Sequence, residues 1–326
     1  MDRKRKTPAI NEKFKLPLKA LRLRAPAFAT IILAFSGCSP DTLDPEATTP
    51  TDVAVQPAPV APSMSIVSAY RGGIAIGTGS PPNSLFGARY NGALRIIGPS
   101  YLLSDLSAIR ARGGRVVLNL AGGQSRFKDK DGHFSFTLWK NSVDRFKRIN
   151  FSSYVKDGTI IGHYLIDQPN DAASWGGKPV SPATVEAMAK YSKSVWPAMH
   201  TIVRAYPDYM VKYSGTYHYL DAAWAQFVYR KGPVDDFLRQ NVALAQKKGL
   251  ALVVGLNLLR GGPNRSRLSA SQVRSWGAAL LNSSYPCAFV SYMYSSNYLS
   301  TSGMKDAMDY LRNKAQNRST KTCRGS

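Results

Sequence analysis

From residue 115 onward, the chain alternates between short apolar runs and longer segments whose apolar residues recur at helical spacing. The runs are rich in β-branched and aromatic residues, which favours strands. They are nearly continuously apolar, a pattern typical of a parallel sheet that is covered on both faces. The strands expected from this pattern are 115–120, 159–166, 201–205, 222–229, 250–256 and 288–292.

Helical patterns fill most of the intervals between these strands. In 182–196, Ser181 is suited to cap the N-terminus and Pro182 to occupy the first turn. In 233–248, Pro233 again begins the segment and Gly249 is a typical stop signal. Further helices are expected at 101–112, 139–153, 270–282 and 303–316.

Repeated strand–helix units over about 260 residues predict an α/β fold, a (β/α)8 TIM barrel or a close variant. The first strand is open between 84–90 and 92–97, with 65–77 as an additional N-terminal strand. A doubly wound sheet is the alternative, but the chain has no glycine-rich phosphate loop between a strand and its helix.

The N-terminal residues have the three parts of a secretory signal. Residues 1–24 carry nine Lys or Arg against two acids, 25–35 are uncharged and mainly apolar, and small residues precede Cys38. The apolar stretch is about half of the roughly 20 residues needed to span a bilayer. The pattern therefore predicts export with a signal peptide at 1–37, and the alternative is a buried segment with a chance cysteine.

The segment Phe35-Ser36-Gly37-Cys38 resembles the lipobox of bacterial lipoproteins, with Phe35 in place of the usual Leu. The resemblance implies that the Cys38 thiol carries acyl chains such as palmitate and becomes the new N-terminus. The membrane would then be a partner through this N-terminal lipid. Ser39 is not the Asp that resembles an inner-membrane retention signal, so the expected location is the cell membrane or, by default where one exists, the outer membrane.

Beyond the lipidated cysteine, 38–63 is predicted to be a disordered linker, because 39–63 contain six prolines and four acids but no basic or aromatic residue. The remaining 64–326 form a single expected domain with 34 basic and 14 acidic residues. Such a charge can attract anionic lipids, acidic glycans or nucleic acid. The basic residues are dispersed and no nucleic-acid-binding motif occurs, so nucleic acid is not an expected partner. Cys287 and Cys323 permit one disulfide, and their pairing stays open.

In a barrel, chemistry lies at the C-terminal ends of the strands. The segment Tyr164-Leu-Ile-Asp167-Gln168-Pro169 ends one strand and resembles glycoside-hydrolase-like TIM barrels, whose strands often end in Tyr-x-x-Asp-Glu-Pro. The resemblance covers 115–262, including the run from Asp221 to Gln226 and the later Gly255-Leu-Asn257. It implies a carbohydrate of the envelope or environment as the ligand.

The departure from that pattern is at Gln168, because an amide cannot exchange a proton as Glu does. Glycoside hydrolysis normally needs two carboxyl groups. Asp167 is one candidate, and Asp208 or Asp171 could be its partner. Alternation along the strand points Asp167 and Gln168 to opposite sides. Whether the protein is a glycoside hydrolase is therefore left open.

The sequence offers more candidate side chains for binding sugar than for hydrolysing it. Trp175, in a loop after the Asp167 strand, is the best candidate for an exposed stacking surface. Arg204 can bind an anionic group or pair with Asp208. The expected binding residues are Asn119, Tyr164, Gln168, Trp175, Arg204, Gln226, Asn257, Tyr292 and Tyr294.

No cofactor or metal is expected. The run Asp129-Lys-Asp131-Gly132 lacks the other ligands of a calcium loop, so a polar turn is favoured. His163 lies within a strand and is expected to be a hydrogen-bonded core residue. Three functions remain: a surface-anchored glycan-binding barrel, an active glycosidase, and an envelope interaction protein whose basic surface holds anionic polymer.

Overall fold

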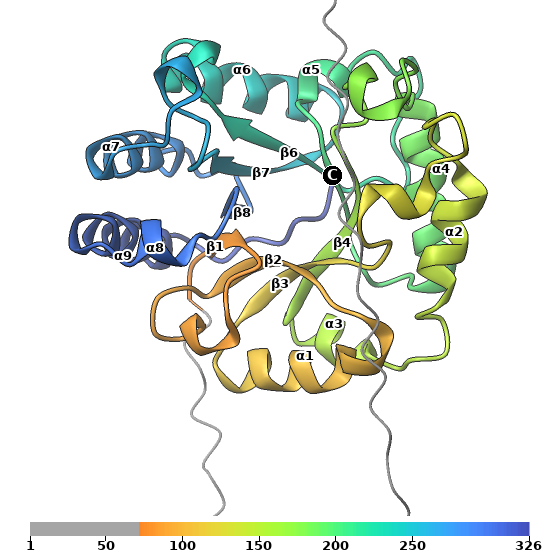
Figure 1. Ribbon diagram of the computed structural model, residues 1–326, viewed down its shortest axis with the longest axis horizontal. Helices are drawn as coiled ribbons and strands as arrows, with labels where there is room; N and C mark the ends of the chain where they lie inside the picture. The colour runs from red at the N-terminus through yellow and green to blue at the C-terminus, as the bar shows by residue number, and fades with distance from the viewer. Residues whose placement is uncertain (1–71, 326) are drawn as a thin grey trace, which may run out of the picture. The chain divides into compact units, whose positions relative to one another are not determined.

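A closed barrel of eight parallel strands forms the centre of the protein, as the computed structural model of residues 72–325 shows (Figure 1). The strands pair in sequence order, and Ala75 of the first lies opposite Ala288 of the last, which closes the ring. The prediction of a (β/α)8 barrel is confirmed. The strands are Ala75–Gly79 (β1), Gly92–Ile96 (β2), Arg115–Asn119 (β3), Ile160–Asp167 (β4), Thr201–Arg204 (β5), Ala222–Phe227 (β6), Ala251–Leu256 (β7) and Ala288–Ser291 (β8).

Helices surround the ring of strands (Figure 1). The α-helices are Leu102–Ala111 (α1), Phe136–Asp144 (α2), Ser152–Lys156 (α3), Pro182–Val195 (α4), Pro207–Met210 (α5), Val234–Lys247 (α6), Ala270–Leu280 (α7), Ser296–Leu299 (α8) and Ser302–Gln316 (α9). Short 3-10 helices occupy Asn83–Leu85, Pro99–Tyr101, Gln124–Phe127, Ala172–Trp175, Tyr229–Lys231 and Pro263–Arg265.

The expected helix signals act as predicted. The side chain of Ser181 accepts a hydrogen bond from the backbone N–H of Thr184 at the start of α4, with Pro182 in the first turn. Gly249 follows the end of α6 with φ +64°, a conformation that glycine adopts at low cost. Local sequence therefore sets the ends of these two helices.

Two regions differ from the sequence prediction. The first strand is 75–79, and 84–90 is not a strand: Phe86 and Tyr90 are buried there, which gives a loop the apolar pattern of a strand. The single helix expected at 139–153 is two helices, α2 and α3. Asn150 accepts a hydrogen bond from the backbone N–H of Ser152, and this local bond starts α3 as a separate helix.

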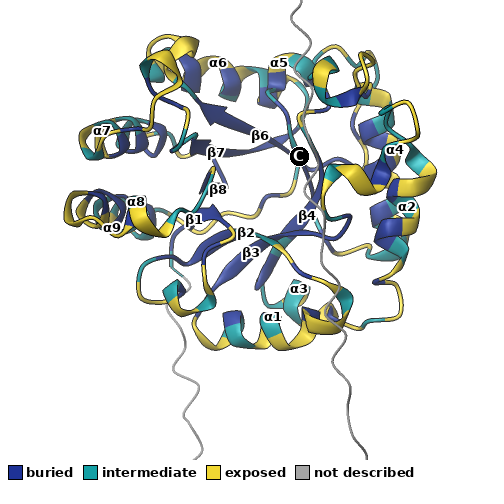
Figure 2. Cartoon of the chain, in the orientation of Figure 1, coloured by how far each residue is buried: buried dark blue, intermediate teal, exposed yellow. Residues whose placement is uncertain are grey.

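The core has two layers, as the burial pattern shows (Figure 2). The strands are buried on both faces, and the helices are exposed only on their outer sides. One apolar cluster fills the barrel interior and runs from Cys287 to Tyr164 and Trp224. The other two clusters lie mainly between the strands and the helices. The interior of the barrel is therefore packed, and space for a ligand has to lie at its ends.

His163 belongs to this packing. It is fully buried, its Nδ1 lies 2.8 Å from the hydroxyl of Ser192, and its ring stacks on that of Trp139. Burial lowers the pKa of His163 to about 3, so the ring is neutral at physiological pH. The prediction of a hydrogen-bonded core histidine is confirmed.

The C-terminal segment crosses the N-terminal end of the barrel. Cys323 forms a disulfide with Cys287, directly before β8, and both sulfurs belong to the interior cluster. Gly325 lies against backbone atoms of Asp221 and Gly249, which precede β6 and β7. The pairing that the sequence left open is therefore made, and it holds the end of the chain over the bottom of the barrel.

The predicted signal peptide, Cys38 and the 38–63 linker lie outside the described residues. Within 72–325, no helix is both long enough and apolar enough to cross a bilayer.

Loss of the disulfide should destabilise the barrel. The bond closes a loop of 36 residues, so we expect Cys323→Ser to lower the free energy of unfolding by about 2–4 kcal/mol. Guanidinium denaturation, followed by tryptophan fluorescence, measures this change. Reducing the wild type should reproduce the loss, and reductant should leave the variant unchanged. An unchanged denaturation midpoint in the variant would contradict the role of the disulfide.

Candidate active site at the barrel mouth

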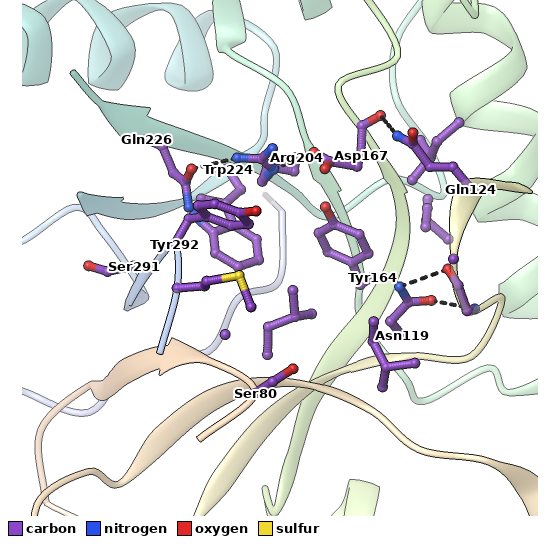
Figure 3. Close-up of a pocket in the computed structure, with 18 of the residues that line it drawn as sticks. Ser80, Asn119, Gln124, Tyr164, Asp167, Arg204, Trp224, Gln226, Ser291 and Tyr292 are labelled. Atoms are coloured by element: carbon purple, nitrogen blue, oxygen red, sulfur yellow. Dashed lines mark hydrogen bonds and ion pairs between the residues drawn. The ribbon is translucent and has the colours of Figure 1, made fainter. Parts of the chain in front are cut away.

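Two adjoining hollows lie at the C-terminal ends of the strands. The inner hollow has a volume of about 200 Å³, and the outer hollow about 470 Å³. They share Arg204, Trp224 and Gln226 as lining residues, so they adjoin at these side chains. The inner hollow is also lined by Asn119, Gln124, Tyr164, Asp167, Ser291 and Tyr292 (Figure 3). The outer hollow is also lined by Gln168, Asn170, Asp171, Tyr206, Arg230, Asn257 and Arg265.

Arg204, the last residue of β5, connects the two neighbouring strands. Its Nε donates to a carboxylate oxygen of Asp167 at the end of β4, and its Nη1 donates to the side-chain oxygen of Gln226 on β6 (Figure 3). Arg204 and Gln226 are largely buried, whereas a third of the Asp167 side chain is exposed. The Asp167–Arg204–Gln226 chain is therefore a polar bridge across three strand ends.

The surroundings of this bridge keep Arg204 charged and the neighbouring Tyr164 hydroxyl neutral. Burial alone would lower the pKa of Arg204, but the neighbouring Tyr164 and Asp167 outweigh it and raise that pKa above its ordinary value. Burial raises the pKa of the Tyr164 hydroxyl well above its usual range, and the Asp167 charge adds to this effect. Arg204 therefore stays a cation and Tyr164 a neutral hydroxyl.

Aromatic rings form one wall of the inner hollow. Tyr292, directly after β8, is 41% exposed, and the Arg204 guanidinium lies 5.7 Å from its ring centre. Trp224 packs edge-to-face against Tyr164, with ring centres 5.7 Å apart. Trp224 of β6 and Tyr292 after β8 both line the inner hollow (Figure 3). The site thus combines a partly exposed ring face with buried hydrogen-bonding groups.

The prediction that Trp175 is an exposed stacking surface is wrong. Trp175 is fully buried, stacked on Phe127 and packed edge-to-face against Phe134. Its Nε1 donates to the backbone oxygen of Gln168 at 3.0 Å. The polar and glycine residues around it gave the segment the appearance of an open loop, whereas its ring anchors the loop after β4.

Anchoring of this loop also explains the position of Gln168. Its backbone N–H donates to Arg204 O at 2.9 Å, and its φ of +43° departs from the strand conformation. The pairing of β4 with β5 also shifts register between Tyr164 and Asp167. Simple alternation therefore fails here, and Asp167 and Gln168 line the adjoining hollows rather than opposite faces of the sheet.

The structure brings most of the predicted binding residues to the mouth, but not all of them are free. Asn119 uses its amide to hold Gly122 through two hydrogen bonds, and the amide oxygen of Asn257 accepts from Arg260 N. Tyr294 lines neither hollow and packs against the core. Asp208 is exposed on α5 and lines neither hollow, so the expected Asp167–Asp208 pair is not assembled.

Among the lining residues that the sequence prediction did not include, three have long polar side chains. Gln124 donates from its side chain to the backbone oxygen of Asp167 at 3.1 Å, and Arg230 and Arg265 line the outer hollow. All three lie in loops that follow strands, where the sequence does not show which loops approach one another. Their position in the loops at the C-terminal ends of β3, β6 and β7 was the available signal.

Carboxylates are scarce at the mouth. Of the residues that line the two hollows, only Asp167 and Asp171 are acidic, and Asp171 accepts a hydrogen bond from the Ser174 hydroxyl at 2.7 Å. Residues 64–326 contain a single glutamate, Glu186. It is buried, and its carboxylate accepts backbone N–H groups of 218, 219 and 220 at 2.7–3.0 Å. Glu186 therefore holds the loop before β6 and is not a catalytic group.

The polar turn at 129–133 brings Asp129, Asp131 and His133 together, with one ligand atom from each within 4.8 Å of the others. Asp129 accepts hydrogen bonds from the backbone N–H groups of Asp131 and His133, both at 2.9 Å. His133 Nε2 lies 3.1 Å from Gly176 O. These contacts explain the cluster as a turn, as the sequence predicted.

No protein-family model and no curated protein matches the chain. Solved structures with the same fold include the β-glucanase SdGluc5_26A from Saccharophagus degradans, at 12% identity and a TM-score of 0.50, over 75% of this chain and 89% of that one. A GH18 chitinase from Pseudoalteromonas aurantia matches at 10% identity and a TM-score of 0.47, over 73% and 98% of the two chains. An endocellulase from Pyrococcus horikoshii matches at 11% and 0.46, over 71% and 84%. At these identities the likeness concerns the TIM-barrel fold alone.

A double-mutant cycle tests the polar bridge. We expect Asp167→Asn to lower the free energy of unfolding by about 1–3 kcal/mol, because it leaves the largely buried Arg204 without its counter-charge. Arg204→Met should also destabilise, and the double variant should lose less than the sum of the two. Urea denaturation measures all three.

Asp208→Asn is the matched control and should change stability by less than about 0.5 kcal/mol, because Asp208 is exposed. Additive losses in the cycle would show that Asp167 and Arg204 do not interact.

Proposed function

We propose that the protein is an exported, lipid-anchored, carbohydrate-binding TIM barrel. The observation that carries the binding role is the composition of the mouth, where the partly exposed Tyr292 ring lies beside the buried Arg204 and Gln226. Sugars present flat apolar ring faces together with many hydroxyl groups. An aromatic wall with convergent amide, hydroxyl and guanidinium groups matches both features.

Binding is favoured over hydrolysis because the required carboxyl pair is not supported. Hydrolysis would need an acid and a base or nucleophile flanking one glycosidic bond. Asp167 is engaged by Arg204, and Gln168 stands where the related pattern has Glu. Asp171 belongs to the other hollow. The β-glucanase with the same fold adds an analogy at the level of the fold only, because one fold can carry several functions.

Export and anchoring rest on the N-terminal sequence. A basic segment, a short apolar segment and the Ser36-Gly37-Cys38 sequence support a cleaved signal with lipid on Cys38. The Cys287–Cys323 disulfide is compatible with this placement, because such bonds persist in oxidising compartments outside the cytosol. The domain would then act at the cell membrane or the outer membrane, facing glycans of the envelope or environment.

Substituting Tyr292 tests the binding role. We expect the wild-type chain to bind oligosaccharides on a glycan array. Tyr292→Ala should weaken the best ligand about 5- to 10-fold, which corresponds to about 1–1.4 kcal/mol of lost ring contact. Tyr101→Ala removes a tyrosine that is 70% exposed and lies outside both hollows, so it should bind as the wild type does.

The same array separates the alternative functions. Salt-sensitive binding to every polyanion, unchanged in Tyr292→Ala, would instead favour an envelope protein that holds anionic polymer through its dispersed basic surface. Release of shorter sugars from a bound oligosaccharide, lost in Asp167→Asn, would contradict the non-hydrolytic function.

Replacing Cys38 tests the anchor. We expect the wild-type chain, expressed in a bacterium, to sediment with membranes, and Cys38→Ala to move into the soluble exported fraction because it lacks the acylated thiol. Cys323→Ser is the matched control, since it removes a cysteine that is not expected to carry lipid. Membrane association that persists in Cys38→Ala would refute lipid anchoring.

A further inference from the structure

The outer hollow carries an excess of positive charge that the mouth does not neutralise. Arg230 and Arg265 both line it and both are exposed. Within 72–325, neither side chain has an ion-pair partner, whereas Arg204 is paired with Asp167. The remaining acid of this hollow is Asp171, whose carboxylate offsets one of the positive charges of Arg230 and Arg265 and leaves an excess of one. Two guanidinium groups are therefore available to a ligand.

Backbone hydrogen bonds hold the two loops that carry Arg230 and Arg265. Arg230 lies in the 3-10 helix Tyr229–Lys231 directly after β6, and Arg265 lies in the 3-10 helix Pro263–Arg265 after β7. The backbone N–H of Tyr229 donates to Gly261 O at 2.7 Å and ties the two loops together. The Arg265 loop is closed by a hydrogen bond from Gly262 N to Ser266 O at 3.0 Å. The backbones that carry both guanidinium groups are thus fixed relative to each other.

Amide side chains line the same hollow. Gln168 and Asn170 are exposed there, while Asn257 is half-buried and uses its amide oxygen for its own loop. Amides donate to and accept from hydroxyl groups, and a guanidinium fork matches the paired oxygens of an anionic group. The set therefore fits a polyhydroxylated ligand that carries a negative charge.

The inner hollow differs in charge. Its Arg204 and Asp167 balance each other, and its other lining groups are neutral. Of the two adjoining hollows, the inner one is therefore electrically balanced and has an aromatic wall, and the outer one is positive. A neutral sugar residue suits the inner hollow, and an anionic one suits the outer hollow.

We propose that the outer hollow binds a sugar residue bearing an anionic group, such as a hexuronate or a sulfated sugar, with Arg230 and Arg265 as partners of that group. This inference rests on the proposed carbohydrate-binding function and specifies its ligand class. The volume of about 470 Å³ is within the usual range of small-molecule sites.

An array of matched oligosaccharides tests the proposal with the full-length chain. It carries galacturonate, glucuronate and mannuronate oligomers, each beside its methyl ester, and sulfated galactans beside the unsulfated forms. Each pair shares one backbone and differs in charge. We expect at least one anionic member to bind 10-fold or more tightly than its neutral partner. The esterified and sulfated pairs together identify which anionic group is preferred.

The double variant Arg230→Ala/Arg265→Ala should reduce that preference to less than about 2-fold and leave neutral oligosaccharides bound as before. Its control is Arg112→Ala/Arg148→Ala, which removes two exposed arginines outside both hollows and lowers the net charge equally. The control should keep the full preference. An equal loss in the control would assign the effect to general charge attraction and overturn the proposal.

Two failures can be told apart. Equal binding of charged and neutral partners, sensitive to Tyr292→Ala, would overturn the anionic ligand and keep the carbohydrate-binding function. Absence of binding to every printed oligosaccharide, neutral or charged, would overturn both.

Discussion

The hydrogen-bonded bridge through Arg204 is the interaction on which the barrel mouth depends. A guanidinium that is largely buried needs hydrogen-bond partners and a counter-charge, and Asp167 and Gln226 each accept one of its hydrogen bonds from the two flanking strands. The same contacts fix the ends of β4, β5 and β6 against one another. The loops that line the outer hollow begin at these strand ends. The hydrogen bonds of Arg204 therefore determine both the position of the strand ends and the charge balance between Arg204 and Asp167.

The loop after β4 holds Gln168 at the position where the glycosidase-like strand pattern has Glu. Trp175 lies inside the protein and binds the backbone of Gln168, which gives residue 168 a fixed position beside Arg204. That position is occupied by an amide. An amide cannot supply the proton that glycoside hydrolysis would transfer, so the position of residue 168 is compatible with the proposed binding of sugar without hydrolysis.

The sequence predicted the barrel well, because buried parallel strands and capped helices leave strong local patterns. It predicted Asp167, Arg204 and Gln226 because each ends a strand or lies near its end. It failed where tertiary packing decides the outcome. Polarity around Trp175 suggested exposure, yet two phenylalanines from a distant loop enclose the ring. Arg230 and Arg265 were missed because the approach of two loops cannot be deduced from either loop alone. Asp208, one of the two candidate partners of Asp167, lines neither hollow, because its position also depends on tertiary packing.

The C-terminal segment, which the disulfide holds, lies at one end of the barrel and distinguishes that end from the other. It covers the end at which the strands begin, and the chain also enters the barrel at that end, through residues 72–75 ahead of β1. The hollows lie at the opposite end. Residues 72–75 and the two hollows therefore lie at opposite ends of the barrel, so substitutions at the disulfide and substitutions at the hollows act on different ends of the same strands.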